Sequence, residues 1–308
     1  MTALTGPPVA ADPAASAARR NADRRRRKRW FAQVGWRHVV GVLAVAFSLF
    51  PIMFVISAAV NPLGTLSSTA LVPTEGVSFG NFGELFERTE FAWWFLNSLL
   101  LSGVATFASI FLSALAAYAF SRMRFAGRRV GLLALLLIQM FPQFLAITAI
   151  FLIFTTVTDL WPAIGFNTPW GLFLLYMGAA LGANTWLMKG FFDTLPKELD
   201  ESATVDGASH AQVFFRIILP LVAPILAVTG LLAFIGSINE FLMANVFLTD
   251  PEAKTLAVGM FGLVAGERNN NFGIFAAGTL LTAIPTVLVF QLLQRYIVSG
   301  LTSGAVKG

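Results

Sequence analysis

Residues 195–220 read LPKELDESATVDGASHAQVFFRIILP, and this stretch decides how the rest of the chain is interpreted. It lies between two apolar segments that are each long enough to cross a membrane. The pattern predicts two short helices joined by a hinge. Thr194 can cap the first helix. Pro196 at the first helical position costs no hydrogen bond, because the backbone N–H that proline lacks would have had no partner there. Gly207 can adopt the left-handed conformation that ends such a helix.

The second helix of this stretch has its own start and stop signals. Ser209 with Gln212 three residues later predicts a capping box, and Pro220 stands at the end of the run. The first helix is acidic, with side chains at Glu198, Asp200, Glu201 and Asp206. An acidic helix does not adhere to an anionic membrane surface, so a protein partner is the better interpretation. An ordinary amphipathic connector between membrane helices is the alternative.

The composition is that of a membrane protein. Of the 308 residues, 56% are hydrophobic and 12% are charged, whereas soluble domains have about 25% charged residues. No cysteine is present, which excludes disulfides and thiolate metal sites. The formal charge of +5 could suggest nucleic acid, but the basic residues cluster beside the apolar segments, which indicates membrane topology instead.

The apolar segments predict an all-α membrane protein. Six segments are near or above the roughly 20 residues that cross the hydrocarbon core. They cover residues 38–60, 92–120, 130–157, 168–190, 217–248 and 272–298. Backbone polar groups in lipid must be satisfied internally, so these segments are predicted to be helices.

Charge sets the predicted orientation. Eighteen of the 21 lysines and arginines fall on the same side as the amino terminus, and the predicted outer loops hold Arg88, Lys254 and Arg268. The positive-inside rule therefore places both termini and residues 195–220 in the cytoplasm. Residues 1–29 are predicted to be a disordered basic tail. Their run of basic residues, 24–29, is interpreted as a topology anchor, with nucleic-acid binding as the alternative.

Polar residues inside the third and fifth segments are candidates for a solute path. Gln139 and Gln143 flank Pro142, which should kink the third helix, and two amides at that depth should face protein or water rather than lipid. An interhelical hydrogen bond is the alternative. Asn239 and Asn245 in the fifth segment are further candidates to face the solute.

Glu240 is the only acid inside an apolar segment, so it needs a partner, a proton or water. A structural or gating role near the outer mouth is the preferred interpretation. A proton-coupling role, which would make the chain an ion-coupled secondary transporter, is the alternative.

Two outer features also have competing interpretations. The run Phe91, Trp93, Trp94 and Phe95 is predicted to be an interfacial aromatic belt, with a sugar platform as the alternative. The first outer loop, residues 61–91, is either a lid or contact for an external protein, or a solvated connector.

The 195–220 stretch resembles a known motif. Glu201, Ala203 and Gly207, followed by an I-x-L-P ending at Pro220, resemble the E-A-A, G, I-x-L-P pattern of permease subunits from bacterial ATP-binding-cassette importers. Asp206, Gly207 and Ala208 match the D-G-A of the carbohydrate branch, and Ser202 stands where an alanine is usual. In that family the loop is a coupling helix that docks into an ATPase subunit. The docking residues that this resemblance implies are Glu201, Ser202, Ala203, Asp206, Gly207 and Ala208.

The end of the chain carries a second resemblance. Residues 300–308 are similar to the tail of the maltose and maltodextrin branch of these permeases, which implies that Ala305, Val306, Lys307 and Gly308 contact the ATPase subunits. A frayed terminus is the alternative. The resemblance divides the chain into the basic tail 1–29, a six-helix permease domain 30–298 and a carboxy-terminal tail 299–308.

The chain itself is not expected to be an enzyme. None of its five lysines follows a glycine, so there is no phosphate-binding loop, and no catalytic or metal constellation is evident. The resemblance implies that ATP and Mg are bound by two partner ATPase subunits. It also implies two further partners, a second homologous permease and an external solute-binding protein. The implied substrate is a maltose-like sugar, carried across the bacterial cell membrane by alternating access. A membrane scaffold without a transport role is a further alternative.

Overall fold

The computed structural model describes residues 31–266 and 270–305, and the described part is helical, with no strand in it. Its α-helices are α2 (Trp36–Ala59), α3 (Gly80–Arg88), α4 (Phe91–Arg122), α5 (Arg128–Met140), α6 (Gln143–Leu160), α7 (Pro169–Phe192), α8 (Glu198–Val205), α9 (His210–Val213), α10 (Leu219–Leu221), α11 (Ala223–Ile238), α12 (Leu242–Phe247), α13 (Leu256–Ala265) and α14 (Phe272–Ala305). Short π-helical turns cover Phe31–Gly35 and Phe214–Ile218, and a 3₁₀ turn covers Pro162–Ile164. The basic tail predicted for residues 1–29 lies outside the described residues.

The chain divides into two units, residues 1–54 and 55–308. The described part of the first unit is the π-helical turn and most of α2, an apolar helix with a proline, Pro51, inside it. Every other helix belongs to the second unit, which contains the candidate site.

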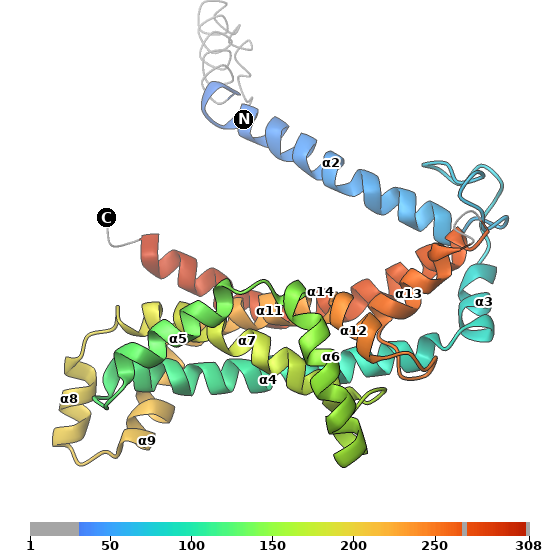
Figure 1. Ribbon diagram of the computed structural model, residues 1–308. Helices are drawn as coiled ribbons and strands as arrows, with labels where there is room; N and C mark the ends of the chain where they lie inside the picture. Colours follow the sequence, from blue (N-terminus) through green and yellow to red (C-terminus); the bar gives the residue numbers. More distant parts are fainter. Residues whose placement is uncertain (1–30, 267–269, 306–308) are drawn as a thin grey trace, which may run out of the picture. The chain divides into compact units, whose positions relative to one another are not determined.

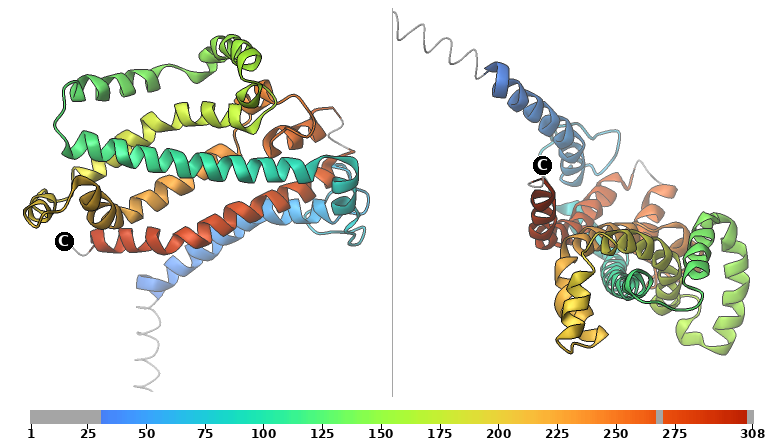
Figure 2. Two further views of the ribbon diagram at one scale, coloured as in Figure 1. Left: turned by 90° about the horizontal axis from the view of Figure 1, so that it is seen from below. Right: turned by 90° about the vertical axis from the view of Figure 1, so that its left-hand side faces the viewer.

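The second unit is organised around α4. The helix is 32 residues long, and its buried residues recur every three or four positions, so they form one face. That face is rich in small side chains such as Ser109, Ser113 and Ala117, which let α7 run alongside it (Figure 1). The helices α11 and α14 also pack against α4, and Figure 2 shows α4, α7, α11 and α14 running side by side.

The expected spans are largely confirmed. Five helical segments in the described residues are long and apolar enough to cross a membrane, and a bent pair, α5 with α6, makes a sixth if it counts as one span. The two helices of that pair meet at 101° near Pro142. The predicted kink at this proline is therefore a complete break. The fifth segment is also interrupted, because α11 ends at Ile238 and α12 begins at Leu242.

The residues before α3 in the predicted first outer loop pack against α3 and α14. Asn81 is buried, and its side-chain amide donates to the carbonyls of Ala59 and Asn61, both at 2.9 Å. The backbone N–H of Gly273 donates to the carbonyl of Gly64 at 2.7 Å. Gly64 has a φ of +62°, and a Cβ there would lie 2.9 Å from the Asn81 amide oxygen, so glycine is required. The loop is not a loose connector.

The predicted aromatic belt is wrong for two of its four members. Phe91 and Trp94 are buried, whereas Trp93 is about half exposed. The Trp94 indole N–H donates to the carbonyl of Pro251 at 2.7 Å, and a Cβ on Gly259 would lie 2.2 Å from the Trp94 ring. These rings hold α13 and the preceding loop against α4 rather than marking the membrane surface.

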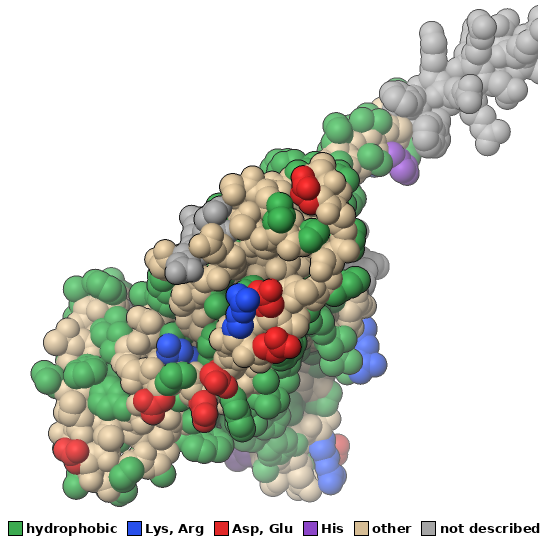
Figure 3. Space-filling view, turned by 90° about the vertical axis from the view of Figure 1, so that its right-hand side faces the viewer, with side chains coloured by type: hydrophobic (Ala, Val, Ile, Leu, Met, Phe, Trp, Pro, Cys, Tyr) green, Lys and Arg blue, Asp and Glu red, His purple; other side chains and the backbone are tan. Residues whose placement is uncertain are grey.

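The end of the second unit that is formed by α3 and the loop before α13 carries acidic side chains (Figure 3). Glu87, Asp250 and Glu252 are exposed there. The residues that follow, from Leu256, are held by Ser98 of α4, whose hydroxyl accepts from the N–H of Leu256 at 2.7 Å. The loop is therefore fixed to α4 while its carboxylates face solvent.

Candidate coupling surface and solute cavity

The 195–220 element folds locally as its sequence predicts at the hinge. Gly207 has a φ of +82°, the left-handed conformation. The N–H of Ala208 donates to the carbonyl of Ala203 at 2.9 Å and that of Gly207 to Thr204 at 3.0 Å, so α8 ends in a Schellman motif. Both hydrogen bonds of the capping box between Ser209 and Gln212 are present at the start of α9. Two short helices joined by a glycine hinge are confirmed.

The predicted start of α8 is wrong. The Thr194 hydroxyl donates to the carbonyl of Phe191 at 2.7 Å and so belongs to the end of α7. The helix α8 begins at Glu198, its N-cap is Lys197, and no side chain caps it. Pro196 therefore precedes the helix. The reason is that α7 runs to Phe192, which is fully buried, and the backbone continues in turns from there.

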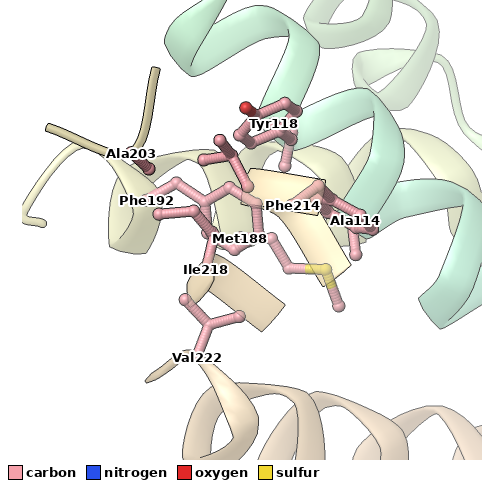
Figure 4. Packing of buried hydrophobic residues seen from close by; sticks show 10 residues of the cluster. Ala114, Tyr118, Met188, Phe192, Ala203, Phe214, Ile218 and Val222 are labelled. Carbon is pink, nitrogen blue, oxygen red and sulfur yellow. The ribbon is translucent and has the colours of Figure 1, made fainter. Parts of the chain in front are cut away.

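An apolar core holds the element against the rest of the unit (Figure 4). Ala203 from α8 and Val213, Phe214 and Ile218 from the second helical run are buried in it. They pack with residues near the ends of α4 and α7, namely Ala114, Ala117, Tyr118, Met188 and Phe192. Because these residues interlock, the element is fixed to the helices rather than suspended from a loop.

The opposite face of α8 is exposed. Glu201 and Ser202 face solvent, and Val205 is 87% exposed, which is unusual for a branched apolar side chain. Of the six residues predicted to dock, Glu201, Ser202, Asp206 and Gly207 are exposed, Ala208 is half-buried, and Ala203 is buried. The predicted docking residues therefore divide into an exposed face on α8 and its hinge, and two alanines, Ala203 and Ala208, that lie beneath that face.

A polar cluster lies where α7 ends beside this element. Asp193 accepts from the Ser121 hydroxyl at 2.6 Å and pairs with the Lys189 ammonium at 2.6 Å. Partial burial by itself raises the pKa of the Asp193 carboxyl, but the hydrogen bonds from Lys189 and Ser121 outweigh it. The net effect holds that pKa below its usual value.

A cavity of about 360 Å³ opens between α4, α7 and the end of α11. Its polar lining residues are Thr106, Ser109, Tyr176, Asn184, Ser237 and Glu240. Hydroxyl, amide and carboxylate groups of this kind can exchange hydrogen bonds with a hydroxylated solute.

Glu240 has the partners that its depth requires. Its carboxylate accepts from the Tyr176 hydroxyl at 2.9 Å and from the backbone N–H groups of Met243 at 2.8 Å and Ala244 at 3.0 Å. The break between α11 and α12 leaves the first N–H groups of α12 without helical partners, and the carboxylate satisfies two of them. Glu240 therefore caps a helix at the edge of the cavity.

The other predicted path residues lie elsewhere. A Cβ on Gly182 would lie 2.6 Å from the Gln139 side-chain nitrogen, so Gln139 packs on α7. The Asn239 amide donates to the carbonyl of Ile235 in its own helix, and Asn245 is exposed on α12. The side chain of Gln143 lies outside the described residues. Of the four whose side chains are described, Glu240 alone is among the residues that line the cavity.

The sequence analysis missed the hydroxyls that share the cavity. Thr106 and Ser109 lie one helical turn apart on α4, and Ser237 lies on α11. Their three-residue spacing on α4 was the available signal, although such hydroxyls in apolar helices commonly bond their own backbone.

The predicted tail contact cannot be placed. The helix α14 ends at Ala305, whose side chain is outside the described set, and Val306, Lys307 and Gly308 lie outside the described residues.

Residues 109–303 match the family model described as "Binding-protein-dependent transport system inner membrane component". The chain belongs to this family. It is therefore a multi-pass membrane protein, and its resemblance to the permease subunits of ATP-binding-cassette importers is confirmed.

The permease has close relatives along most of its length. It is 40% identical over 263 residues to the galactooligosaccharides transport system permease protein GanQ of Bacillus subtilis, covering 84% of this chain and 90% of that protein. It is 36% identical to the maltodextrin permease MalD of Streptococcus pneumoniae, covering 92% and 98%. It is 35% identical to the maltose/maltodextrin permease MalG of Escherichia coli, covering 88% and 95%.

Solved structures share the fold. A chain of a bacterial ABC transporter involved in the import of the acidic polysaccharide alginate superposes with a TM-score of 0.71 at 22% identity, covering 88% of this permease and 98% of that chain. The alternative of an ion-coupled secondary transporter is not supported by these matches.

Proposed function

We propose that this chain is a permease subunit of an ATP-driven importer for oligosaccharides of the maltodextrin or galactooligosaccharide class. The observation that carries the proposal is 35–40% identity over more than four-fifths of the chain to permeases named for those sugars. The relatives carry both names, so the substrate class is wider than the maltose-like sugar expected from the tail.

The proposed ATPase-docking face is the outward side of α8 and the hinge after it. Glu201, Ser202, Asp206 and Gly207 supply this face, with Val205 as an apolar projection between them. Ala203 and Ala208 lie beneath and support it. An exposed apolar side chain ringed by polar groups is typical of a protein contact.

The remaining partners complete the proposed assembly. Two ATPase subunits bind ATP and Mg, and a second homologous permease shares the path. A solute-binding protein delivers sugar to the outer end, and the structure of the alginate-importing neighbour in complex with its pentasaccharide-bound periplasmic protein supports this partner. Ala305, Val306, Lys307 and Gly308 remain a proposed second contact with the ATPase subunits.

The cavity edged by Glu240 is the proposed part of the sugar path on this subunit. Its hydroxyl and amide groups face a space between α4, α7 and α11, which are helices that could cross the membrane. In alternating access these helices reorient around the path, and the nucleotide acts by binding the two states with different affinities.

The docking proposal is tested by breaking the outward face without touching its core. Gly207→Pro cannot adopt the φ of +82°, and Glu201→Lys reverses an exposed charge. In proteoliposomes containing the whole complex, both variants should insert and hydrolyse ATP while sugar uptake falls. Arg129→Glu, a charge reversal at an exposed residue of α5 outside the proposed docking face, is the matched control. Normal coupled uptake in both hinge-region variants would overturn the proposal.

A further inference from the structure

Arg122, the last residue of α4, contacts the 195–220 element directly. Its side chain is only 6% exposed, and its Nε lies 3.1 Å from the Asp200 Oδ2 on α8, which makes a buried ion pair without hydrogen-bond geometry. Its Nη2 donates to the carbonyl of Leu195 at 2.9 Å. The rigid guanidinium fork therefore holds two points of the element at once.

The contact differs in kind from the apolar packing around it. Apolar burial is non-directional, whereas the hydrogen bond from Arg122 to the Leu195 carbonyl depends on direction and the ion pair joins Arg122 to one specific partner. The next residue towards the amino terminus, Ser121, donates to Asp193 at the end of α7. The last turn of α4 is thus tied both to α7 and to the 195–220 element.

The helix that ends at Arg122, α4, also reaches the cavity and the outer end. Thr106 and Ser109 line the cavity. One helical stretch of about 20 Å separates Ser109 from Arg122, at 1.5 Å per residue. Near the outer end, the Asn97 side-chain amide donates to the carbonyls of Glu252 at 2.7 Å and Lys254 at 3.2 Å.

We propose that Arg122 is a positioning residue that makes the 195–220 element and α4 move as one body. A displacement of α8 would then travel along α4 to the cavity wall and to the outer loop that Asn97 holds. The inference rests on the proposed function, because it requires a motor that acts on α8. Neither Arg122 nor Asp200 is in the docking face.

The experiment uses the complete importer in proteoliposomes and measures sugar uptake per ATP hydrolysed. Arg122→Gln and Asp200→Asn each remove the ion pair. Arg122→Gln also removes the hydrogen bond to the Leu195 carbonyl, so the double variant loses nothing beyond what Arg122→Gln alone loses. Each single variant should lower the ratio of uptake to hydrolysis about tenfold, which is within the usual range of coupling between sites. The double variant should be no worse than Arg122→Gln alone. Arg122→Lys should fall between, since an ammonium keeps the charge but loses the fork.

Two readouts separate coupling from a general loss of structure. The chain has no cysteine, so Val205→Cys gives a single reporter on α8 for crosslinking to the ATPase subunit. That crosslink and the ATPase rate should persist in the Arg122 and Asp200 variants. Arg129→Gln, which replaces an exposed arginine on α5 that is part of neither α8 nor the cavity lining, is the matched control and should leave the ratio unchanged.

An unchanged ratio in Asp200→Asn overturns the inference, even if Arg122→Gln does not assemble. Additive losses in the double variant also overturn it. If Glu201→Lys uncouples while Asp200→Asn does not, the docking proposal stands and only the Arg122 inference fails. If the wild-type background with Val205→Cys never crosslinks to an ATPase subunit, the proposed function itself fails.

Discussion

Replacing Glu240 distinguishes a helix cap from a proton carrier. The carboxylate accepts three hydrogen bonds, two from backbone N–H groups of Met243 and Ala244 and one from Tyr176. In Glu240→Gln the single carbonyl oxygen can still accept from Ala244 and Tyr176. The new amide group then faces the Met243 N–H, donor against donor, and one bond is lost.

The magnitudes follow from that inventory. One lost hydrogen bond costs Glu240→Gln about 1 kcal/mol of folding free energy. Glu240→Ala leaves all three donors without the carboxylate, and at about 1 kcal/mol each the loss is about 3 kcal/mol, reduced where cavity water replaces a bond. Tyr176→Phe removes one donor and keeps both backbone bonds, so it should resemble Glu240→Gln.

Thermal unfolding of the purified complex and sugar uptake in proteoliposomes measure the two effects. We expect the order wild type, then Glu240→Gln and Tyr176→Phe together, then Glu240→Ala in both assays. A Glu240→Gln variant that unfolds like wild type but transports nothing would refute the cap argument, since the carboxylate would then act in transport itself, through its charge, its proton or a contact with the sugar.

Three further changes test separate parts of the structure. Gly207→Ala should lower the free energy of unfolding by about 1 kcal/mol. The cost comes from the φ of +82° alone, because the added Cβ meets no other atom. Denaturation of the complex should show a smaller loss of stability for Gly207→Asn, since asparagine tolerates this conformation better. Because the folded pKa of Asp193 lies below its unfolded value, its contribution to stability is present above about pH 4 and is lost as the pH falls through the folded pKa. Asp193→Asn should therefore flatten the acid limb of a pH titration of unfolding. Gly259→Ala should destabilise by about 1–3 kcal/mol, since its Cβ would lie 2.2 Å from the Trp94 ring, and a cysteine in the loop before α13 should become more reactive in that variant.

The span pattern could be predicted because it depends on local properties. Apolar length requires helices in lipid, and Pro142 removes a backbone donor wherever the third segment lies. The hinge at Gly207 is equally local, since the Schellman and capping-box bonds all lie within residues 203–212.

The predictions that were wrong concern residues whose contacts depend on parts of the chain far away in sequence. Threonine is a common N-cap residue, which is why the sequence predicts Thr194 to start α8. Burial of Phe192 extends α7 instead, and the Thr194 hydroxyl donates to the carbonyl of Phe191 at the end of that helix. Trp94 at a helix end looks the same in sequence whether it meets lipid headgroups or protein, and Gly259, 165 positions later, decides the matter. The cavity likewise requires α4, α7 and α11 to be brought together before Thr106 and Ser237 can share it.

The acidic run of α8 is divided between two tasks by helix geometry. Asp200 and Glu201 are neighbours in sequence, but successive helical residues point about 100° apart. Asp200 faces Arg122 with its side chain 18% exposed, whereas Glu201 is exposed. If α8 docks as proposed, the first acts within the permease and the second towards the ATPase subunit, so their substitutions should combine additively. We expect Asp200→Asn to reduce uptake per ATP while the Val205→Cys crosslink to the ATPase persists, and Glu201→Lys to weaken that crosslink as well. Loss of the crosslink in both variants would show that the whole acidic run is one docking surface.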